Sequence, residues 1–529
     1  MERRHFLRAA LAGAAGLALG PVLPPPASAA RQNQKKPLPE LPKNLPGWLT
    51  NRDANHVFWT RGKYNFAVYK VRPLALDLNA VSVGHSMAYE DMVTGRTAQL
   101  ETKTFARIDN VLKNPPRFAP SERFIGNTFS RRFGVLEQVF DQTHLLHSQT
   151  VDVLAEPSLS RAEKEAEIER LYEIYRTTTP YAITPLPLNM GYLYGQSYSR
   201  AFRNRYPKVN GLFWGYHWLQ GAMYDALYGL TLEEQRKVYD VLGRQYHDVE
   251  LYRTDRIFMP MTAEVSPRFS ARFPHIANVF DNLHMLHDMV NDILVTEGLT
   301  RKQQDEQVTR AIWLVMEKAH EGYKPGDAPE PNGWRDYRHM EGMPGMGLMP
   351  DMTPEAMFMQ GLGWMSLGEC HHCSMPLPEG RDAWRAHSVT ADGWTMRVRC
   401  PLCARDMSLE TKGRAVLYVS TESPERPLVL ISDDQGNLTP ASDRGRDVVF
   451  LEQEASHAGC SEWSQAFTNR AAFDAFVAAN PEYRGAKART LAEWSALEGK
   501  RPDTYFKRQG PPGNPFDGAA EKKNEGSKP

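Results

Sequence analysis

Two stretches of the sequence closely match each other and decide how the first half of the chain folds. Residues 139–161 read VFDQTHLLHSQTVDVLAEPSLSR, and residues 279–301 read VFDNLHMLHDMVNDILVTEGLTR. Ten of these 23 positions are identical without a gap, and an Arg-Phe pair lies upstream of each copy. A stretch that recurs at a fixed spacing indicates a duplicated structural unit. We therefore predict a helical domain over 75–322, built from related units at about 75–200 and 201–322.

The pattern that the two copies share is Asp-x-x-His-x-Leu-His. Residues three apart lie about 60° apart around a helix axis, so the acid and both histidines of each copy share one broad face. Imidazole and carboxylate side chains on facing helices are how helical bundles build metal centres. The predicted ligands are Asp141, His144 and His147 in the first copy and Asp281, His284 and His287 in the second. A weaker match adds one upstream histidine to each unit, namely His85 and His217.

The duplicated pattern has a second interpretation that needs no metal. Histidines that face a core often only hydrogen-bond a neighbouring aspartate, and duplicated sequences keep their buried residues for packing. Asp141 and Asp281 would then simply orient His144 and His284. Neither copy carries the Glu-x-x-His pattern of di-iron carboxylate bundles, and no Cys-x-x-Cys-His sequence for covalent haem attachment occurs.

The five cysteines all lie between Cys370 and Cys460, which indicates a local site and argues against a chain-wide disulfide framework. Cys370-His371-His372-Cys373 and Cys400-Pro401-Leu402-Cys403 are two Cys-x-x-Cys pairs, and the spacer between them runs from Ser374 to Arg399. Two such pairs can place four thiolates around one tetrahedral ion, usually zinc. Disulfides or a redox-active pair are the alternatives in an oxidising compartment.

The region around these cysteines reads as a small α+β domain over 365–495. The apolar runs 416–420 and 428–432 are typical of strands, and 469–479 is typical of a helix. We expect this domain to hold a structural zinc ion through its four paired cysteines.

Several short motifs fall in the same region. They are Cys373-Ser374-Met375-Pro376, Asp392-Gly393, Ser456-His457-Ala458-Gly459, Ala466-Phe467 and Phe473-Asp474-Ala475-Phe476. Together they resemble the NosL-type copper-binding family, whose members act as periplasmic copper chaperones in nitrous oxide reductase maturation. The resemblance implies copper binding and a client metalloprotein as partner. The softer ion would then use Met375, His371, His372, His457 and Cys460.

Residues 323–364 are rich in Met, Gly and Pro and are predicted to form a linker, in which 339–352 read HMEGMPGMGLMPDM. Thioether sulfur is soft and suits Cu(I). Methionines spaced by Gly and Pro form no apolar helical stripe, so packing explains them poorly. The candidate copper ligands are His339, Met340, Met343, Met346, Met349 and Met352. The alternative is a flexible segment that lies on an apolar groove.

The N-terminal segment, 1–30, predicts export. Arg3-Arg4 and Phe6-Leu7 precede an apolar run from Ala9 to Gly20 and small residues at 27–30, which resembles a twin-arginine signal peptide. An ordinary secretory signal or a membrane anchor is the alternative, although the run is short for a bilayer. We expect a mature protein without a transmembrane segment, in the periplasm or another extracytoplasmic compartment.

These features predict an α plus α+β chain, in which a duplicated helical bundle is followed by a small α+β metal-binding domain. A flexible arm at 31–74 and a disordered tail at 496–529 flank the folded part. The formal net charge is zero, so no broad basic field exists to attract nucleic acid.

Three functions remain open at this point. The first, which these features favour, is an exported copper-handling protein that acts in chaperoning, sequestration or metalloenzyme maturation. The second is a metalloenzyme with a His/Asp metal or haem centre in the bundle, and the third is an interaction protein with structural zinc only. Motifs of hydrolases, kinases and dehydrogenases do not occur, so the sequence leaves it undecided whether the chain is an enzyme.

Overall fold

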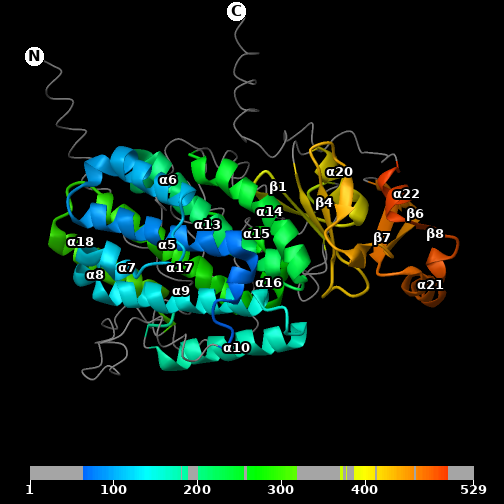
Figure 1. Cartoon of the computed structure of the whole chain (residues 1–529), viewed down its shortest axis with the longest axis horizontal. Coiled ribbons are helices and arrows are strands. Elements are labelled where there is room, and N and C mark those ends of the chain that lie inside the picture. Colours follow the sequence, from blue (N-terminus) through cyan, green and yellow to red (C-terminus); the bar gives the residue numbers. More distant parts are fainter. Residues whose placement is uncertain are drawn as a thin grey trace, which may run out of the picture.

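The protein consists of a helical body joined to a smaller β-rich body (Figure 1). The computed structural model describes 63–179, 181–186, 188, 200–254, 259–317, 370–372, 377, 387–410, 414–457 and 460–497. Helices fill the first part of this range, and antiparallel strands with a few helices fill the part after 370. The predicted α plus α+β class is confirmed at this level.

The helical body contains four long helices and several shorter ones. The long helices are α5 (Arg72–Val93), α9 (Gly134–Ala155), α13 (Pro207–Leu227) and α17 (Pro274–Val295). The others are α6 (Phe105–Lys113), α7 (Glu122–Ile125), α8 (Asn127–Arg132), α10 (Arg161–Thr178), α12 (Arg200–Arg205), α14 (Leu232–Asp248), α15 (Thr262–Val265), α16 (Pro267–Arg272) and α18 (Arg301–Val315). Short helical turns lie at Ala67–Val71, Thr97–Gln99, Leu100–Thr104 and Glu250–Tyr252.

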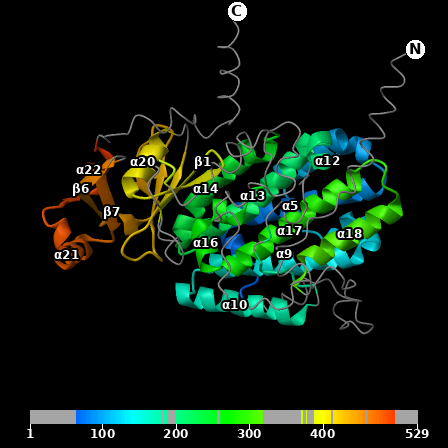
Figure 2. The same ribbon diagram turned by 180° about the vertical axis from the view of Figure 1, so that it is seen from behind.

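The long helices pack across the two halves of the helical body. Helices α5 and α9, which come from the first half, each contact both α13 and α17 from the second half. The starting positions of α7, α8, α9 and α10 (122, 127, 134 and 161) recur with one constant shift in α15, α16, α17 and α18 (262, 267, 274 and 301). Helices from both halves therefore border one shared interior (Figure 2).

Local sequence signals explain where these helices begin. Capping boxes open α10, α14 and α18, because the hydroxyls of Ser160, Thr231 and Thr300 accept from the backbone three residues on. Proline lies in the first turn of α5, α13, α16 and α17, where its missing N–H costs nothing. Folded structure begins earlier than the predicted arm allows, since 67–74 is already helical and Val68 and Val71 are buried.

The β-rich body contains two antiparallel sheets. The first has the order β2-β1-β3-β4-β5, with β1 (His387–Ala391), β2 (Trp394–Val398), β3 (Val416–Val419), β4 (Leu428–Ser432) and β5 (Leu438–Pro440). The second has the order β7-β6-β8, with β6 (Val449–His457), β7 (Cys460–Phe467) and β8 (Lys487–Arg489). Helices α20 (Pro401–Glu410), α21 (Arg470–Ala479) and α22 (Leu491–Ser495) accompany them, so the predicted strands at 416–420 and 428–432 and the predicted helix at 469–479 are confirmed.

The two bodies share one packed junction. Val416, Tyr418 and Val429 of the first sheet belong to the apolar core of the helical body. The indole Nε1 of Trp218 in α13 donates to the backbone oxygen of Gly393, at 2.5 Å, in the turn between β1 and β2. The β1–β2 turn is therefore anchored to the immediate chain neighbour of His217.

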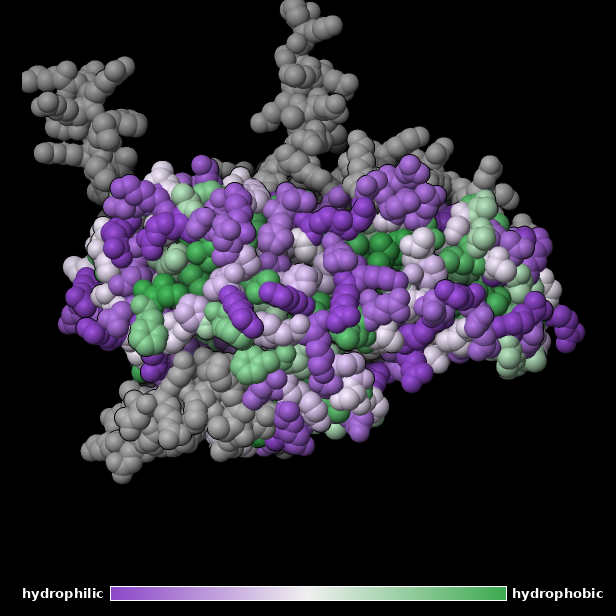
Figure 3. Space-filling view, viewed as in Figure 1, coloured by the Kyte–Doolittle hydropathy of each residue, from purple (hydrophilic) through white to green (hydrophobic). Residues whose placement is uncertain are grey.

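Hydrophilic side chains cover most of the face shown in Figure 3, with small apolar areas between them. Among the described helices, none combines the length and the apolar character that crossing a membrane requires.

Gly393 lies where a side chain does not fit. Its φ is +79°, and a Cβ built on it would lie 1.5 Å from Oε1 of the buried Glu250. Gly95 has a similar φ of +77° but no atom within 4 Å of such a Cβ. We predict that Gly95→Ala lowers the free energy of unfolding by about 1 kcal/mol through backbone strain alone. Gly393→Ala should cost a further ~1–3 kcal/mol, because Glu250 must move.

Urea unfolding followed by tryptophan fluorescence measures both losses. Equal losses for the two variants would show that the turn does not pack tightly against Glu250.

Candidate metal centre

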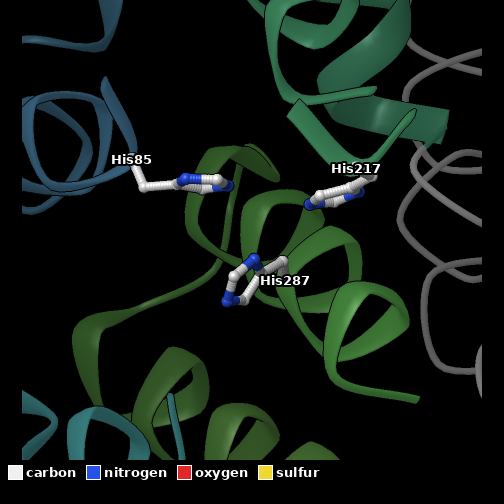
Figure 4. A group of neighbouring side chains, drawn as sticks. All are labelled: His85, His217 and His287. Atoms are coloured by element: carbon white, nitrogen blue, oxygen red, sulfur yellow. The ribbon is translucent and has the colours of Figure 1, made fainter. Parts of the chain in front are cut away.

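The four long helices direct five histidines into their shared interior. They are His85 of α5, His144 of α9, His217 of α13, and His284 and His287 of α17. Four of them are almost completely buried, with 3% or less of the residue exposed, whereas His144 is only half-buried. Figure 4 shows His85, His217 and His287 pointing toward one another from three different helices.

These three histidines have the spacing of a potential metal site. One ring nitrogen from each of His85, His217 and His287 lies within 4.8 Å of the other two. Nitrogens that bind one tetrahedral ion at 2.0–2.1 Å are about 3.3 Å apart. Binding one ion would therefore require the three side chains to move closer together.

The remaining two histidines adjoin this group. The ring of His144 lies 5.3 Å from that of His287, measured between centroids. The ring of His284 stacks on that of His217 at 4.1 Å, with an angle of 8° between the planes. Two parallel rings do not aim their nitrogens at a common point, so His217 and His284 are not arranged to bind the same ion.

Most nitrogens of the cluster have no hydrogen-bond partner among the described residues. The atoms concerned are Nε2 of His85 and His284 and both ring nitrogens of His144, His217 and His287. The other nitrogen of His85, Nδ1, lies 3.0 Å from the backbone oxygen of Val81 and must donate to it. That bond leaves the lone pair of His85 on Nε2, the atom that a metal would bind.

Burial keeps these imidazoles neutral. Loss of hydration lowers the pKa of His85 to about 4 and lowers the pKa of His144, His217, His284 and His287 well below the usual 6.5. The neighbouring histidines lower the pKa of the last four further. A metal ligand must be a neutral imidazole, so the cluster is in the binding form at pH 7 without releasing protons.

Aromatic side chains and one close backbone contact hold the rings in place. The centroid of the Phe140 ring lies 4.0 Å from the centroid of the His287 ring. The centroids of the Phe213 and His85 rings are 4.7 Å apart. A Cβ on Gly84 would lie 2.4 Å from the hydroxyl of Tyr216, so only glycine at this position lets α5 and α13 approach. Because these surroundings are apolar, burying ring nitrogens without a hydrogen-bond partner costs more free energy.

The other residues predicted in the bundle lie outside the cluster. His147 contacts Tyr224 and Phe280, and its Nε2 lies 3.2 Å from the backbone oxygen of Gln220. The carboxylate of Asp141 lies 3.7 Å from the guanidinium of Arg123.

Asp281 is equally separate from the cluster. Its carboxylate accepts from both the backbone N–H and the hydroxyl of Thr262, at 2.8 and 2.7 Å. Neither aspartate provides a partner for the ring nitrogens of His144 or Nε2 of His284, so the purely structural interpretation has no supporting hydrogen bond at these atoms.

A cavity of about 380 Å³ reaches the cluster from one side and is bordered by His85 and His144. No pattern in the sequence indicates it, because its walls come from segments far apart along the chain.

Three of the predicted cysteine ligands lie together in the β-rich body. Cys370, Cys400 and Cys403 are buried in one core cluster. The Sγ atoms of Cys400 and Cys403 are 3.5 Å apart, too far for a disulfide bond at about 2.05 Å and near the ~3.8 Å spacing of two thiolates on one zinc ion. The backbone N–H of Arg399 donates to Cys370 Sγ at 3.3 Å.

The nearby histidines point to other partners. His371 Nδ1 lies 3.0 Å from the backbone oxygen of Arg397, and His372 Nε2 lies 3.9 Å from the carboxylate of Asp406. His457 and Cys460 are paired across the β6–β7 hairpin, and the structure describes only their backbone. The other predicted ligands, Cys373, Met375, His339, Met340, Met343, Met346, Met349 and Met352, lie outside the described residues.

Comparison with known proteins gives no relative for this arrangement. The chain matches no protein-family model, no curated protein and no solved structure.

The lowered histidine pKa values predict an acid-sensitive fold. Between about pH 6.5 and pH 4 the unfolded chain takes up protons on histidines that the folded protein keeps neutral. The free energy of unfolding of the metal-free protein should therefore fall with decreasing pH in this window, by about 1.4 kcal/mol per pH unit for each such histidine. Urea unfolding at several pH values measures it.

Two variants make this pH test specific. Burial lowers the pKa of His147 to about 4, so His147→Gln should remove one histidine's share of the slope. The hydrogen bond to Asp77 raises the pKa of His247, so that residue titrates above the window and His247→Gln should leave the slope unchanged. Stability that is flat from pH 6.5 to 4 would contradict the prediction.

Proposed function

We propose that this chain is a metalloenzyme whose resident transition-metal centre, most favourably copper, is bound by the histidine cluster of the helical body. One observation carries the proposal: eight buried nitrogens of five imidazole rings, which come from four helices, have no hydrogen-bond partner among the described residues. Each buried polar group left without a partner costs about 1–3 kcal/mol. Coordination to a metal would give the one lone pair of each ligating ring a partner.

The donor set favours copper among the available metals. Imidazole suits zinc, copper, iron and nickel, and copper(II) binds most strongly to such nitrogen sites. No carboxylate belongs to the group His85, His217 and His287, which disfavours the oxygen-preferring magnesium, calcium and manganese.

The helical pattern supports two ions. Dinuclear carboxylate bundles take a Glu from each of two helices and a Glu-x-x-His pair from each of the other two. Here α5 and α13 each contribute one histidine, while α9 and α17 each carry a His-x-x-His pair. His85, His217 and His287 would bind one ion, and a second ion would have only His144 and His284, because His147 of the α9 pair lies outside the cluster.

We further propose that the two halves arose by duplication. Ten identities in 23 positions, and four helix pairs whose starting positions differ by one constant shift, support it. Duplication explains how a single ligand-bearing unit produced a centre at the interface of two copies.

A copper-handling role is the second candidate. The NosL-type motifs and the methionine-rich segment favour it, and the buried cysteines Cys370, Cys400 and Cys403 suit a zinc or copper ion. Delivery of copper to a client protein requires ligands from which the ion is readily released, whereas the described histidines lie deep between four helices. We therefore assign the histidine centre to a resident cofactor and the cysteines to structural zinc. Twin-arginine export, which carries folded cofactor-loaded proteins, agrees with this assignment.

We predict that the double variant His217→Gln/His287→Gln loses the histidine-bound copper, with affinity lowered more than about tenfold, because two metal ligands are removed. Elemental analysis after dialysis against copper measures the content. The matched control is His275→Gln, since His275 is bonded to Glu169 at 3.0 Å outside the cluster and should keep wild-type copper.

Cobalt(II) spectra separate the two metal sites. Thiolate ligands give cobalt(II) an intense near-ultraviolet charge-transfer band, whereas imidazole ligands give only visible bands. Cys400→Ser/Cys403→Ser should remove the former and leave the latter. Full copper content in folded His217→Gln/His287→Gln protein would refute the histidine centre.

A further inference from the structure

The cavity beside the histidine cluster is large enough for a small molecule. It measures about 380 Å³ and lies against α5 and α9, with Gln220 of α13 also in its lining. A cavity of roughly 150 Å³ already accepts benzene, so this one has room for a single ring with substituents. Which molecule suits it depends on the groups that face the cavity.

The acidic side chains of the lining already have partners in the structure. These are the hydroxyl of Ser82 for Glu122, the guanidinium of Arg123 for Asp141 and the backbone N–H of Val68 for Asp152, at 3.0, 3.7 and 2.9 Å. A molecule in the cavity therefore does not have to supply the hydrogen bonds or the countercharge that these carboxyl groups need.

The side chain of Gln220 differs from these groups. Gln220 is only 5% exposed, and its Oε1 is buried without a hydrogen-bond partner among the described residues. Of the other described residues that line the cavity, only His85 and His144 have buried side-chain atoms in this state. Because a buried acceptor without a partner costs free energy, Oε1 of Gln220 calls for a donor from a bound molecule or from solvent.

Helix α13 places this carboxamide beside the histidine cluster. Gln220 follows His217 by three residues, so the two side chains lie on one broad face of the helix. The backbone oxygen of Gln220 lies 3.2 Å from Nε2 of His147, which brings α13 against α9 at the buried end of the cavity. A donor group bound to Oε1 of Gln220 would therefore share the cavity with His85 and His144.

Much of the remaining lining is apolar. Leu78, Val81 and Val151 border the cavity, and at its exposed end the ring centroid of Phe118 lies 5.8 Å from that of Tyr69. Phe118 is 56% exposed, so part of its ring surface is free to pack against a bound molecule.

These two parts of the lining define the chemistry of a matching ligand. Apolar walls favour a ring that leaves water, because burying apolar surface lowers the free energy. The single acceptor on Gln220 favours one hydrogen-bond donor on that ring. A neutral hydroxyl group loses less hydration than an ion does when it enters such a cavity.

We propose that this cavity binds a small neutral molecule with an apolar ring and a hydroxyl group, and that Gln220 positions it beside the metal centre. The hydroxyl donates to Oε1 of Gln220, and the ring packs against the apolar wall and Phe118. The assignment of this molecule as the substrate of the centre rests on the proposed metalloenzyme function, whereas its binding does not.

The probes p-cresol and toluene test the inference, because they share the ring and the methyl group and differ only in the hydroxyl. Calorimetric titration of the metal-free full chain should show p-cresol bound at least about threefold more tightly than toluene, although toluene is the more hydrophobic of the two. A third probe, 4-methylanisole, keeps the oxygen but has no donor, so it should bind no more tightly than toluene.

Two buried glutamines provide a matched pair of variants. Gln220→Leu removes the acceptor and should weaken p-cresol binding by roughly threefold to tenfold while leaving toluene binding unchanged. Gln142 is 1% exposed and its Nε2 lacks a partner among the described residues, but it does not line the cavity, so Gln142→Leu should change neither affinity. Circular dichroism confirms the fold, and Gln220→Met replaces Gln220→Leu if the latter does not fold.

Two exposed phenylalanines test the apolar wall separately from the acceptor. Phe118→Ala should weaken p-cresol and toluene by a similar factor of roughly threefold to tenfold, because both probes lose the same ring contact. Phe124→Ala, at a residue that is 87% exposed and does not line the cavity, should leave both affinities unchanged.

The outcomes separate this inference from the metal proposal. No binding of p-cresol, equal binding of p-cresol and toluene, or a p-cresol affinity that Gln220→Leu leaves unchanged would overturn the pocket, even if copper binds. Selective p-cresol binding that depends on Gln220, with no copper uptake, would sustain the pocket and refute the metal centre. With copper bound, p-cresol should also shift the visible copper spectrum, and an unchanged spectrum would refute the placement of the hydroxyl beside the metal.

Discussion

The helical half of this protein is organised around five histidine rings, and most of their nitrogens are buried without a hydrogen-bond partner among the described residues. A neutral imidazole carries one N–H donor and one acceptor, and both lose water on burial. Five such rings meet where α5 and α9 cross α13 and α17, and the surrounding aromatic rings offer no hydrogen bonds to most of their nitrogens. Unsatisfied groups on this scale are uncommon in folded proteins and call for a bound ion or solvent. The proposed metal therefore serves stability as well as chemistry.

The sequence predicted which histidines the structure brings together, apart from His147, although whether they bind a metal stays a prediction. The His-x-x-His faces of α9 and α17 were readable because both copies align without a gap. His85 and His217 matched only weakly, because they are not related by the shift that aligns the two His-x-x-His copies. Under that shift His85 aligns with Asp225, so a search at one fixed spacing misses this pair. His147 lies outside the cluster, because its Nε2 is within hydrogen-bond distance of the backbone oxygen of Gln220 on another helix. Such choices depend on tertiary neighbours that spacing does not reveal.

In the β-rich body, too, local sequence predicted the strands and a helix, whereas contacts between distant residues could not be predicted. Apolar β-branched runs predicted β3 and β4, and Asn469 caps α21 through its side chain, as helix-capping chemistry favours. The junction with the helices was not predictable, since Trp218 and Gly393 are far apart along the chain. Because this bond fixes Trp218, it also restrains the neighbouring His217. The β-rich body thus contributes to the histidine cluster through packing.

One difference between the two halves would give the proposed centre a direction. In the first half, Asp141, His147 and Ser148 border the cavity. The residues aligned with them under the proposed duplication, Asp281, His287 and Asp288, are completely buried. Asp281 accepts from Thr262, and Asp288 accepts from the indole of Trp214. These positions are therefore buried in the second half, whereas in the first half they border the cavity. If the histidine cluster binds a metal as proposed, this difference would let a second molecule approach the ion from the side of α9 only.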